Sequence, residues 1–245
     1  MFKAETKNVK QLKSIFIGAS NIVDEIQIEI DSDGMRARAL DRSHVSFISF
    51  DLSVDFFDEF TLTEPETLHV DMDNVVNVLK RSKNNDILTI TTDSNNIIFT
   101  FTGESKRTFN IKQIDMDYTS PEPPIINTPI NKLPIPFTIL KDSVTDIEMV
   151  TEKINIKVTE DNVIFTGQGN FSDVQTEYLH GERVDTTIDS NYTLEYIKKI
   201  LQINQVTDTI YLSLGTDTPL LIHLEGLEGE KVEFLLAPRM EEREE

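Results

Sequence analysis

The hydrophobic pattern of this chain occurs twice. Residues 26–30 and 35–39 alternate apolar and polar side chains on either side of an Asp-Gly pair, and residues 154–158 and 163–167 do the same around an Asp-Asn pair 128 residues later. Strict alternation is typical of half-buried antiparallel strands, and Asp-Gly or Asn between two such runs favours a hairpin. The pattern therefore predicts two β-hairpins of one kind.

Other stretches have the period of an amphipathic helix, with apolar residues recurring every three or four positions. Leu12 and Leu140 occupy matching places in two of them and are again 128 residues apart. Two further stretches, about 122 residues apart, each precede a pair of short strand patterns. Helices are expected over residues 7–19, 72–83, 136–148 and 191–203.

Between the two copies the chain is rich in proline, with Pro121, Pro123, Pro124 and Pro129 close together. Proline removes a backbone donor and favours extended backbone, so this stretch is expected to be a linker. The fold class that follows is α+β, with two duplicated domains that each pack two helices on antiparallel sheets; one internally repeated domain is the alternative. The expected bounds are residues 1–117 for the first domain, 118–130 for the linker and 131–245 for the second.

The composition removes several classes of protein. The chain has 245 residues, 38% of them hydrophobic, which is enough for the cores of two small domains. It has no Cys, which excludes disulfides, thiolate zinc sites and cysteine nucleophiles. The N-terminus lacks the apolar stretch of a signal peptide, and no run approaches the ~18 apolar residues of a membrane span. A cytoplasmic protein is expected, with no membrane partner.

Charge is distributed unevenly along the sequence. The chain carries 23 basic and 43 acidic residues, a net charge of −20, which taken alone disfavours binding to nucleic acid. The four expected helices, however, hold nine basic and five acidic residues, a net charge of +4 against −24 elsewhere. Lysine is a good helix former on solvated faces; the alternative is that the helices share one face, which is presented to DNA phosphates. The residues assigned to a DNA-facing surface are Lys10, Lys13, Lys80, Arg81, Lys83, Lys141, Lys198 and Lys199.

Four segments carry distinctive motifs. Residues 41–52 read DRSHVSFISFDL, residues 217–220 read DTPL, residues 236–242 read LAPRMEE, and residues 75–90 combine a helical pattern with a strand. In order and spacing these segments resemble the sliding clamps of archaeal and eukaryotic type, the proliferating cell nuclear antigen family. The corresponding family motifs are D-S-S-H-V, D-V-P-L and L-A-P-K-I-E, and the resemblance extends over essentially the whole chain.

The resemblance implies a ring that is not an enzyme. In this family three subunits, each of two similar domains, form a closed ring with sheets outside and helices lining the hole. The ring encircles duplex DNA without reading its sequence and raises the effective concentration of the enzymes tethered to it. The implied partners are double-stranded DNA, two further copies of the chain, DNA polymerase, a clamp loader of the replication factor C type, flap endonuclease and DNA ligase. The loader supplies the ATP chemistry, so no cofactor is expected, and the implied localisation is cytoplasmic and nucleoid-associated.

Ring closure in the family pairs an edge strand of one subunit with an edge strand of the next, and unpaired edges invite such pairing. The corresponding strands are residues 106–114 and 171–179, with Phe109 and Tyr178 as interface anchors. For each of these residues an ordinary internal strand is the alternative.

Family partners dock a short helical turn into a pocket beneath the linker, and an apolar pocket with few polar groups suits an aromatic anchor. Residues 116–126 of the linker are expected to complete it, although this linker is shorter and richer in proline than the family's. By position, the implied pocket residues are Leu40, His44, Val45, Phe47, Pro219, Leu220, Leu235, Ala237 and Pro238.

Catalysis finds little support in the sequence. The four histidines lack metal-ligand spacing, no metal site is expected, and no Walker loop, G-x-S-x-G or G-x-G-x-x-G motif occurs. A metal-dependent nuclease remains an alternative if Asp31 and Asp33 join Asp71 and Asp73. We instead interpret the first pair as a hairpin turn and the second as a helix N-terminus. An acidic interaction scaffold that does not encircle DNA is the other alternative, and the ring consists either of one gene product or of related subunits.

Overall fold

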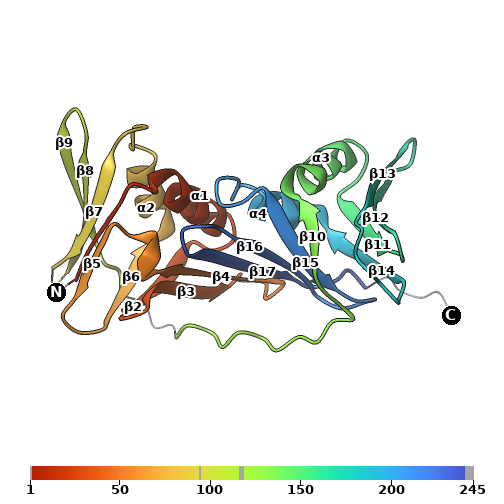
Figure 1. Ribbon diagram of the computed structural model, residues 1–245, viewed down its shortest axis with the longest axis horizontal. Coiled ribbons are helices and arrows are strands. Elements are labelled where there is room, and N and C mark those ends of the chain that lie inside the picture. The colour runs from red at the N-terminus through yellow and green to blue at the C-terminus, as the bar shows by residue number, and fades with distance from the viewer. Residues whose placement is uncertain (1, 94, 116–118, 241–245) are drawn as a thin grey trace. The chain divides into compact units, whose positions relative to one another are not determined.

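The computed structural model describes residues 2–93, 95–115 and 119–240 (Figure 1). The start of the expected linker, at residue 118, and Met116 of the expected pocket lie outside these ranges. The expected domain bounds stay a prediction. Contacts divide the chain into two compact units: Met1–Pro123 with Gln202–Val206 and Glu225–Val232, and Pro124–Leu201 with Thr207–Leu224 and Glu233–Glu245.

The first unit combines helices with antiparallel strands. Its elements are β1 (Phe2–Thr6), α1 (Val9–Ser20), β2 (Glu25–Asp31), β3 (Gly34–Leu40), β4 (Ser46–Ser53), the 3₁₀ turn η1 (Val54–Phe56), β5 (Glu59–Leu62), β6 (Glu66–Asp71), α2 (Met72–Leu79), β7 (Ile87–Thr92), β8 (Asn96–Thr102) and β9 (Lys106–Lys112). One sheet has the order β5-β1-β7-β8-β9, and β4, β3, β2 and β6 are neighbours in that order. Helices α1 and α2 pack against each other (Figure 1).

The hairpin predicted for residues 26–39 is confirmed as β2 and β3. Asp31 pairs with Gly34 across the turn, and the three isoleucines of β2 are at most 4% exposed. Gly34 has a φ of 139°, and a Cβ atom there would lie 2.1 Å from the carbonyl oxygen of Leu52. The Asp-Gly turn therefore depends on glycine at this position.

The second unit repeats the arrangement. Its elements are β10 (Ile130–Pro136), α3 (Phe137–Glu148), β11 (Lys153–Val158), β12 (Asn162–Gln168), β13 (Asp173–Leu179), β14 (Ile188–Thr193), α4 (Leu194–Ile200) and β15 (Thr209–Leu214), while β16 (Leu220–Glu225) and β17 (Glu230–Leu236) have residues in both units. One sheet has the order β13-β12-β11-β14, and β10, β15 and β16 are neighbours in that order. The second predicted hairpin is confirmed as β11 and β12, whose inward residues Ile154, Ile156 and Phe165 are fully buried.

The α+β class and the helical faces follow the sequence pattern, but α2 and α4 are several residues shorter than predicted. Helix α2 ends at Leu79, and the chain leaves it through a tight turn in which the Arg81 N–H donates to the Val78 carbonyl. The expected start of the fourth helix instead belongs to β14, where Thr193 pairs with Lys153 of β11, so α4 covers only Leu194–Ile200. A tight turn therefore ends α2 early, and strand pairing delays the start of α4; apolar spacing alone indicates neither.

A short segment distant in sequence completes the first unit. Ile203 packs so closely on α1 that a Cβ atom at Gly18 would lie 2.1 Å from the Ile203 Cγ1. The Ser14 hydroxyl on the same helix donates to the Gln202 carbonyl at 3.3 Å. These contacts explain why Gln202–Val206 belongs with the first unit. None of the described helices is both long and apolar enough to cross a membrane.

Candidate functional site

The positive charge predicted for the helices lies partly beside them. Within the bounds of the structure, the four described α-helices hold five basic and five acidic residues, so their net charge is zero. The predicted excess of +4 therefore does not belong to the helices themselves. It comes from Lys7, Lys80, Arg81 and Lys83, which lie just outside helices α1 and α2.

In the first unit, α1 and the turn after α2 bring cations together. We call residues 80–83 the basic turn. The Lys13 ammonium lies 3.5 Å from the hydroxyl of Ser82 in this turn. Lys10, Lys80 and Arg81 are exposed, and no described acidic side chain forms an ion pair with any of them. Five of the eight residues assigned to DNA thus gather on one helix and the adjoining turn.

In the second unit, two of the three assigned cations are paired. Lys198 on α4 forms an ion pair with Glu148 at the end of α3, and Lys199 pairs with Glu195 at 2.9 Å. Lys141 on α3 is exposed. Exposed ion pairs contribute little to stability, but each carboxylate offsets the positive potential of its partner. In the first unit, Lys83 lies 3.8 Å from the Glu104 carboxylate, and none of the other four assigned cations has an ion pair with a described acidic side chain. The second unit therefore presents less uncompensated positive charge than the first.

A buried carboxylate shapes the turn that carries His44 and Val45. Asp41 accepts hydrogen bonds from the N–H groups of Val45 at 2.8 Å and Ser46 at 2.7 Å, and from Ser43. The turn holds His44 exposed, with a φ of 57°. The left-handed conformation costs free energy for a residue with a Cβ atom, so the contacts of Asp41 are what fix it.

Four of the implied pocket residues belong to this part of the first unit. Leu40 is 37% exposed and His44 is exposed, while Val45 is half-buried. Phe47 is only 3% exposed and packs in the core. Of these four residues, only Leu40, His44 and Val45 therefore reach the surface, beside the exposed Arg42 and Ser43.

In the second unit, β14 holds the segment that carries Pro219. The Ser190 hydroxyl accepts from the Asp217 N–H at 2.7 Å and donates to the Gly215 carbonyl at 2.9 Å. The Tyr192 hydroxyl donates to the Thr218 carbonyl at 2.9 Å. Burial raises the pKa of the Tyr192 phenol to about 12, so the phenol keeps its proton and remains a donor.

The same strand also holds the C-terminal segment, because the Arg239 N–H donates to the Asn191 carbonyl at 2.7 Å. The implied pocket pieces at Pro219 and at the C-terminal segment are thus both tied to consecutive residues of β14. That these residues form one pocket stays a prediction. Pro219, Leu235, Ala237 and Pro238 are half-buried, and Leu220 is fully buried.

The strands expected to close a ring end their sheets among the described strands, β9 in the first unit and β13 in the second. Both are shorter than expected, since they cover Lys106–Lys112 and Asp173–Leu179. Phe109 is half-buried and packs edge-on against Phe101, with ring centroids 5.9 Å apart. Tyr178 is half-buried, and the neighbouring Leu179 is 70% exposed.

The two edge strands carry opposite charge. β9 contains Lys106, Arg107 and Lys112 and no acidic residue. β13 contains Asp173 and Glu177 and no basic residue. Opposite charges on facing strands stabilise pairing, and like charges oppose it.

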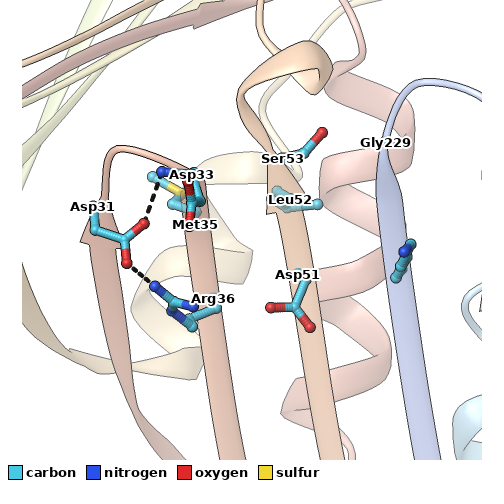
Figure 2. A pocket seen from close by; sticks show the side chains of 10 residues that line it. Asp31, Asp33, Met35, Arg36, Asp51, Leu52, Ser53 and Gly229 are labelled. Atoms are coloured by element: carbon cyan, nitrogen blue, oxygen red, sulfur yellow. Dashed lines mark hydrogen bonds and ion pairs between the residues drawn. The ribbon is translucent and has the colours of Figure 1, made fainter.

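The aspartates of the nuclease alternative lie apart. Figure 2 shows Asp31 beside a cavity of about 290 Å³, where its carboxylate pairs with Arg36 and accepts the Asp33 N–H at 2.9 Å. The Asp71 side chain caps α2 by accepting the Asn74 N–H. In the strand register Asp71 lies opposite Glu25, at the other end of β2 from Asp31. The six residue steps along β2 from Glu25 to Asp31 separate the two aspartates by roughly 20 Å. Across the described ranges, no three His, Asp or Glu side chains meet in a way that could hold a metal ion.

The sequence is similar to proteins of one family. Residues 1–121 match the family model of the proliferating cell nuclear antigen N-terminal domain. A protein of Methanothermobacter thermautotrophicus named DNA polymerase sliding clamp is 44% identical over 246 residues, and the alignment covers all of both chains. The chain belongs to the proliferating cell nuclear antigen family of sliding clamps.

Solved structures of this family share the fold. The structure of the proliferating cell nuclear antigen of Thermococcus kodakaraensis aligns with a TM-score of 0.90 at 23% identity, covering 98% of this chain and 100% of that one. A chain of the PCNA2–PCNA3 complex of Sulfolobus tokodaii aligns with a TM-score of 0.89 at 24% identity, covering 98% and 100%. These likenesses confirm the predicted clamp fold.

Sequence reasoning missed the residues that hold the surface segments of this clamp-family chain in place. Asp41 belongs to the segment that resembles a family motif, but the sequence pattern does not predict its hydrogen-bonding role. Ser190 and Tyr192 lie outside the family motifs. An Asp side chain favours local hydrogen bonds to backbone N–H groups a few residues further along the chain, which is a signal for Asp41. No comparable local signal exists for Ser190 and Tyr192, because their partners lie 25 or more residues away.

Proposed function

We propose that the chain is a non-catalytic DNA sliding clamp, which encircles duplex DNA and tethers replication and repair enzymes to it. The observation that carries this proposal is the identity of 44% over the full length of a protein named DNA polymerase sliding clamp. The repeated unit, with a helix pair and an edge strand in each copy, supports it.

The ring consists of three copies of this chain. Pairing β9 with β9 or β13 with β13 places like charges opposite each other, whereas β9 against β13 of a neighbouring copy joins opposite charges. Such heterologous contacts generate a ring when the rotation closes. Phe109 and Tyr178 provide apolar surface beside the paired strands.

Light scattering across a dilution series tests the assembly. We expect three times the 28.0 kDa mass of one chain, and Phe109→Ala should shift dissociation to higher protein concentration. Thr108→Ala, on an exposed neighbouring position of the same strand, is the matched control. A mass of one chain at every concentration would contradict a homotrimer and favour a mixed ring, for which the complex of two different Sulfolobus tokodaii chains is a precedent.

DNA contacts involve phosphates alone. Lys10, Lys13, the three cations of the basic turn, Lys141, Lys198 and Lys199 face the duplex and hold it loosely without base readout. The acidic remainder of the chain discourages binding elsewhere on the surface. The partners at the apolar pocket are DNA polymerase, a clamp loader of the replication factor C type, flap endonuclease and DNA ligase, and the protein acts in the cytoplasm on the nucleoid.

Extension of a primed circular template tests the function. With a cognate polymerase, the clamp loader and ATP, adding the protein should lengthen the products of a single binding event. The ring-weakened Phe109→Ala variant should give shorter products at protein concentrations where its mass falls to that of one chain. Product lengths that do not respond to the protein would contradict the proposed function.

A further inference from the structure

Arg107 differs from the other basic residues of β9 because its side chain points back into its own unit. Its Nη1 donates to the Arg81 carbonyl at 2.7 Å, and its Nη2 pairs with the Asp86 carboxylate. Only 23% of the Arg107 side chain is exposed. The edge strand is thereby joined directly to the basic turn, residues 80–83.

Asp86 connects the same guanidinium to a second point of the turn. Its side chain is 3% exposed, and its carboxylate accepts the Lys83 N–H at 2.6 Å. The Asp86 carboxylate packs tightly against Gly103, since a Cβ atom at that glycine would lie 2.5 Å from the Asp86 Oδ1. Arg107 therefore holds the backbone at Arg81 directly and the backbone at Lys83 through Asp86.

The Arg107 guanidinium also packs over an aromatic ring. Arg107 pairs with Phe101 across β8 and β9, and its guanidinium carbon lies 5.4 Å from the centre of the Phe101 ring. The buried Nε has no hydrogen-bond partner among the described atoms, which costs free energy that the terminal contacts must outweigh. A planar fork is needed to reach a carbonyl and a carboxylate at once, and lysine, with a single ammonium, lacks one.

We propose that Arg107 is a positioning residue for DNA binding: from the edge strand β9 it fixes the basic turn so that the side chains of Lys80, Arg81 and Lys83 face the DNA phosphates. This rests on the proposed clamp function, because it assumes that these three cations face DNA. Arg107 itself touches protein, and its effect on DNA passes through the turn.

The experiment measures how a short fluorescent linear duplex binds the assembled protein as the NaCl concentration rises, by fluorescence anisotropy. Each phosphate contact contributes about 0.9 to the slope of log affinity against log salt. Replacing Lys80, Arg81 and Lys83 together by Ala should lower that slope. Arg107→Met should lower it in the same direction although all three cations remain, whereas Lys106→Met, which removes the same charge from the same strand, should change it little.

Asp86→Asn separates positioning from plain electrostatics by the sign of its effect. Removing a negative charge near DNA strengthens binding if charge alone matters. If Asp86 anchors the turn through Arg107, the variant weakens binding and lowers the salt slope. Stronger binding by Asp86→Asn would overturn the proposal.

Two controls keep the outcomes distinct. Light scattering selects concentrations at which every variant has the mass of the unaltered protein, and hydrogen exchange at the Lys83 amide reports the turn independently of assembly. We expect faster exchange there in Arg107→Met than in Lys106→Met. An unchanged slope in the triple variant would refute the DNA-facing role of the turn and with it part of the proposed function. A lowered slope in the triple variant, with Arg107→Met behaving like Lys106→Met, would refute the positioning role alone.

Discussion

At the scale of single residues, the surface segments of this protein are held by polar side chains that bond to backbone groups. Asp41 organises residues 43–46, and Ser190 and Tyr192 hold the segment before Leu220. Each of the three is buried, with at most 6% of its surface exposed. Their hydrogen bonds are therefore made away from competing water, and losing a partner leaves a backbone group unsatisfied.

Replacing Asp41 by Asn should destabilise the protein. The amide offers one acceptor oxygen where the carboxylate offers two, and hydrogen bonds to a charged group contribute about 1.5–3 kcal/mol each. We expect a loss of about 2 kcal/mol, measured as a lower urea midpoint with an unchanged m-value. Asp55→Asn, an exposed acidic residue of η1, is the control. Equal midpoints for the two variants would contradict the role assigned to Asp41.

Glu230 makes stability depend on pH. Burial raises the pKa of its carboxyl above the ordinary value of 4.5, although the Glu228 N–H donates to it at 3.0 Å and opposes the shift. A raised pKa means that the ionised form is disfavoured in the folded protein. The contribution of the Glu230 carboxyl to the free energy of unfolding is therefore greatest below pH 4.5. That contribution is lost as the pH rises through the raised pKa.

Glu230→Gln should therefore raise the thermal midpoint at pH 7, and the difference from the unaltered protein should close as the pH falls towards 4.5. Glu228→Gln, two residues away and exposed, should show no such convergence. Differential scanning calorimetry at a series of pH values measures both. A difference that stays constant with pH would show that the carboxyl of Glu230 is not the source.

At the scale of elements, the sequence predicts the hairpins and helix faces well because buried positions follow the periods of two and 3.6 residues. Val9, Leu12, Phe16 and Ala19 of α1 are each at most 4% exposed, as the pattern indicates. The ends of α2 and α4 are less predictable. They are decided by strand pairing and by Asp86, which lie outside the helical pattern.

The two helix pairs should differ in their importance for DNA. Removing two cations of the first unit, with Lys10→Ala and Arg81→Ala, should lower the salt slope of DNA binding by about 0.9 for each lost phosphate contact. Lys198→Ala with Lys199→Ala removes the same charge but should change the slope less, because glutamates already pair with both lysines. Equal changes in anisotropy titrations would contradict this difference between the units.

At the scale of the whole molecule, duplication follows from the pattern alone, because the second hairpin repeats the first after 128 residues. Encirclement of DNA does not. The net charge of −20 argues against DNA, and the charge excess expected on the helices lies instead in the turns beside them. The family resemblance supplied the function, and the full-length relative is what supports it most strongly.

A clamp that encircles DNA is held by topology, and a scaffold is held by contact. The most direct measurement loads fluorescent protein onto nicked circular DNA with the clamp loader and ATP, removes free protein in high salt, and then cuts the circle once. Retention on the intact circle and rapid release after cutting are the predicted result. Loss from the intact circle at the same rate as from linear DNA would contradict the account.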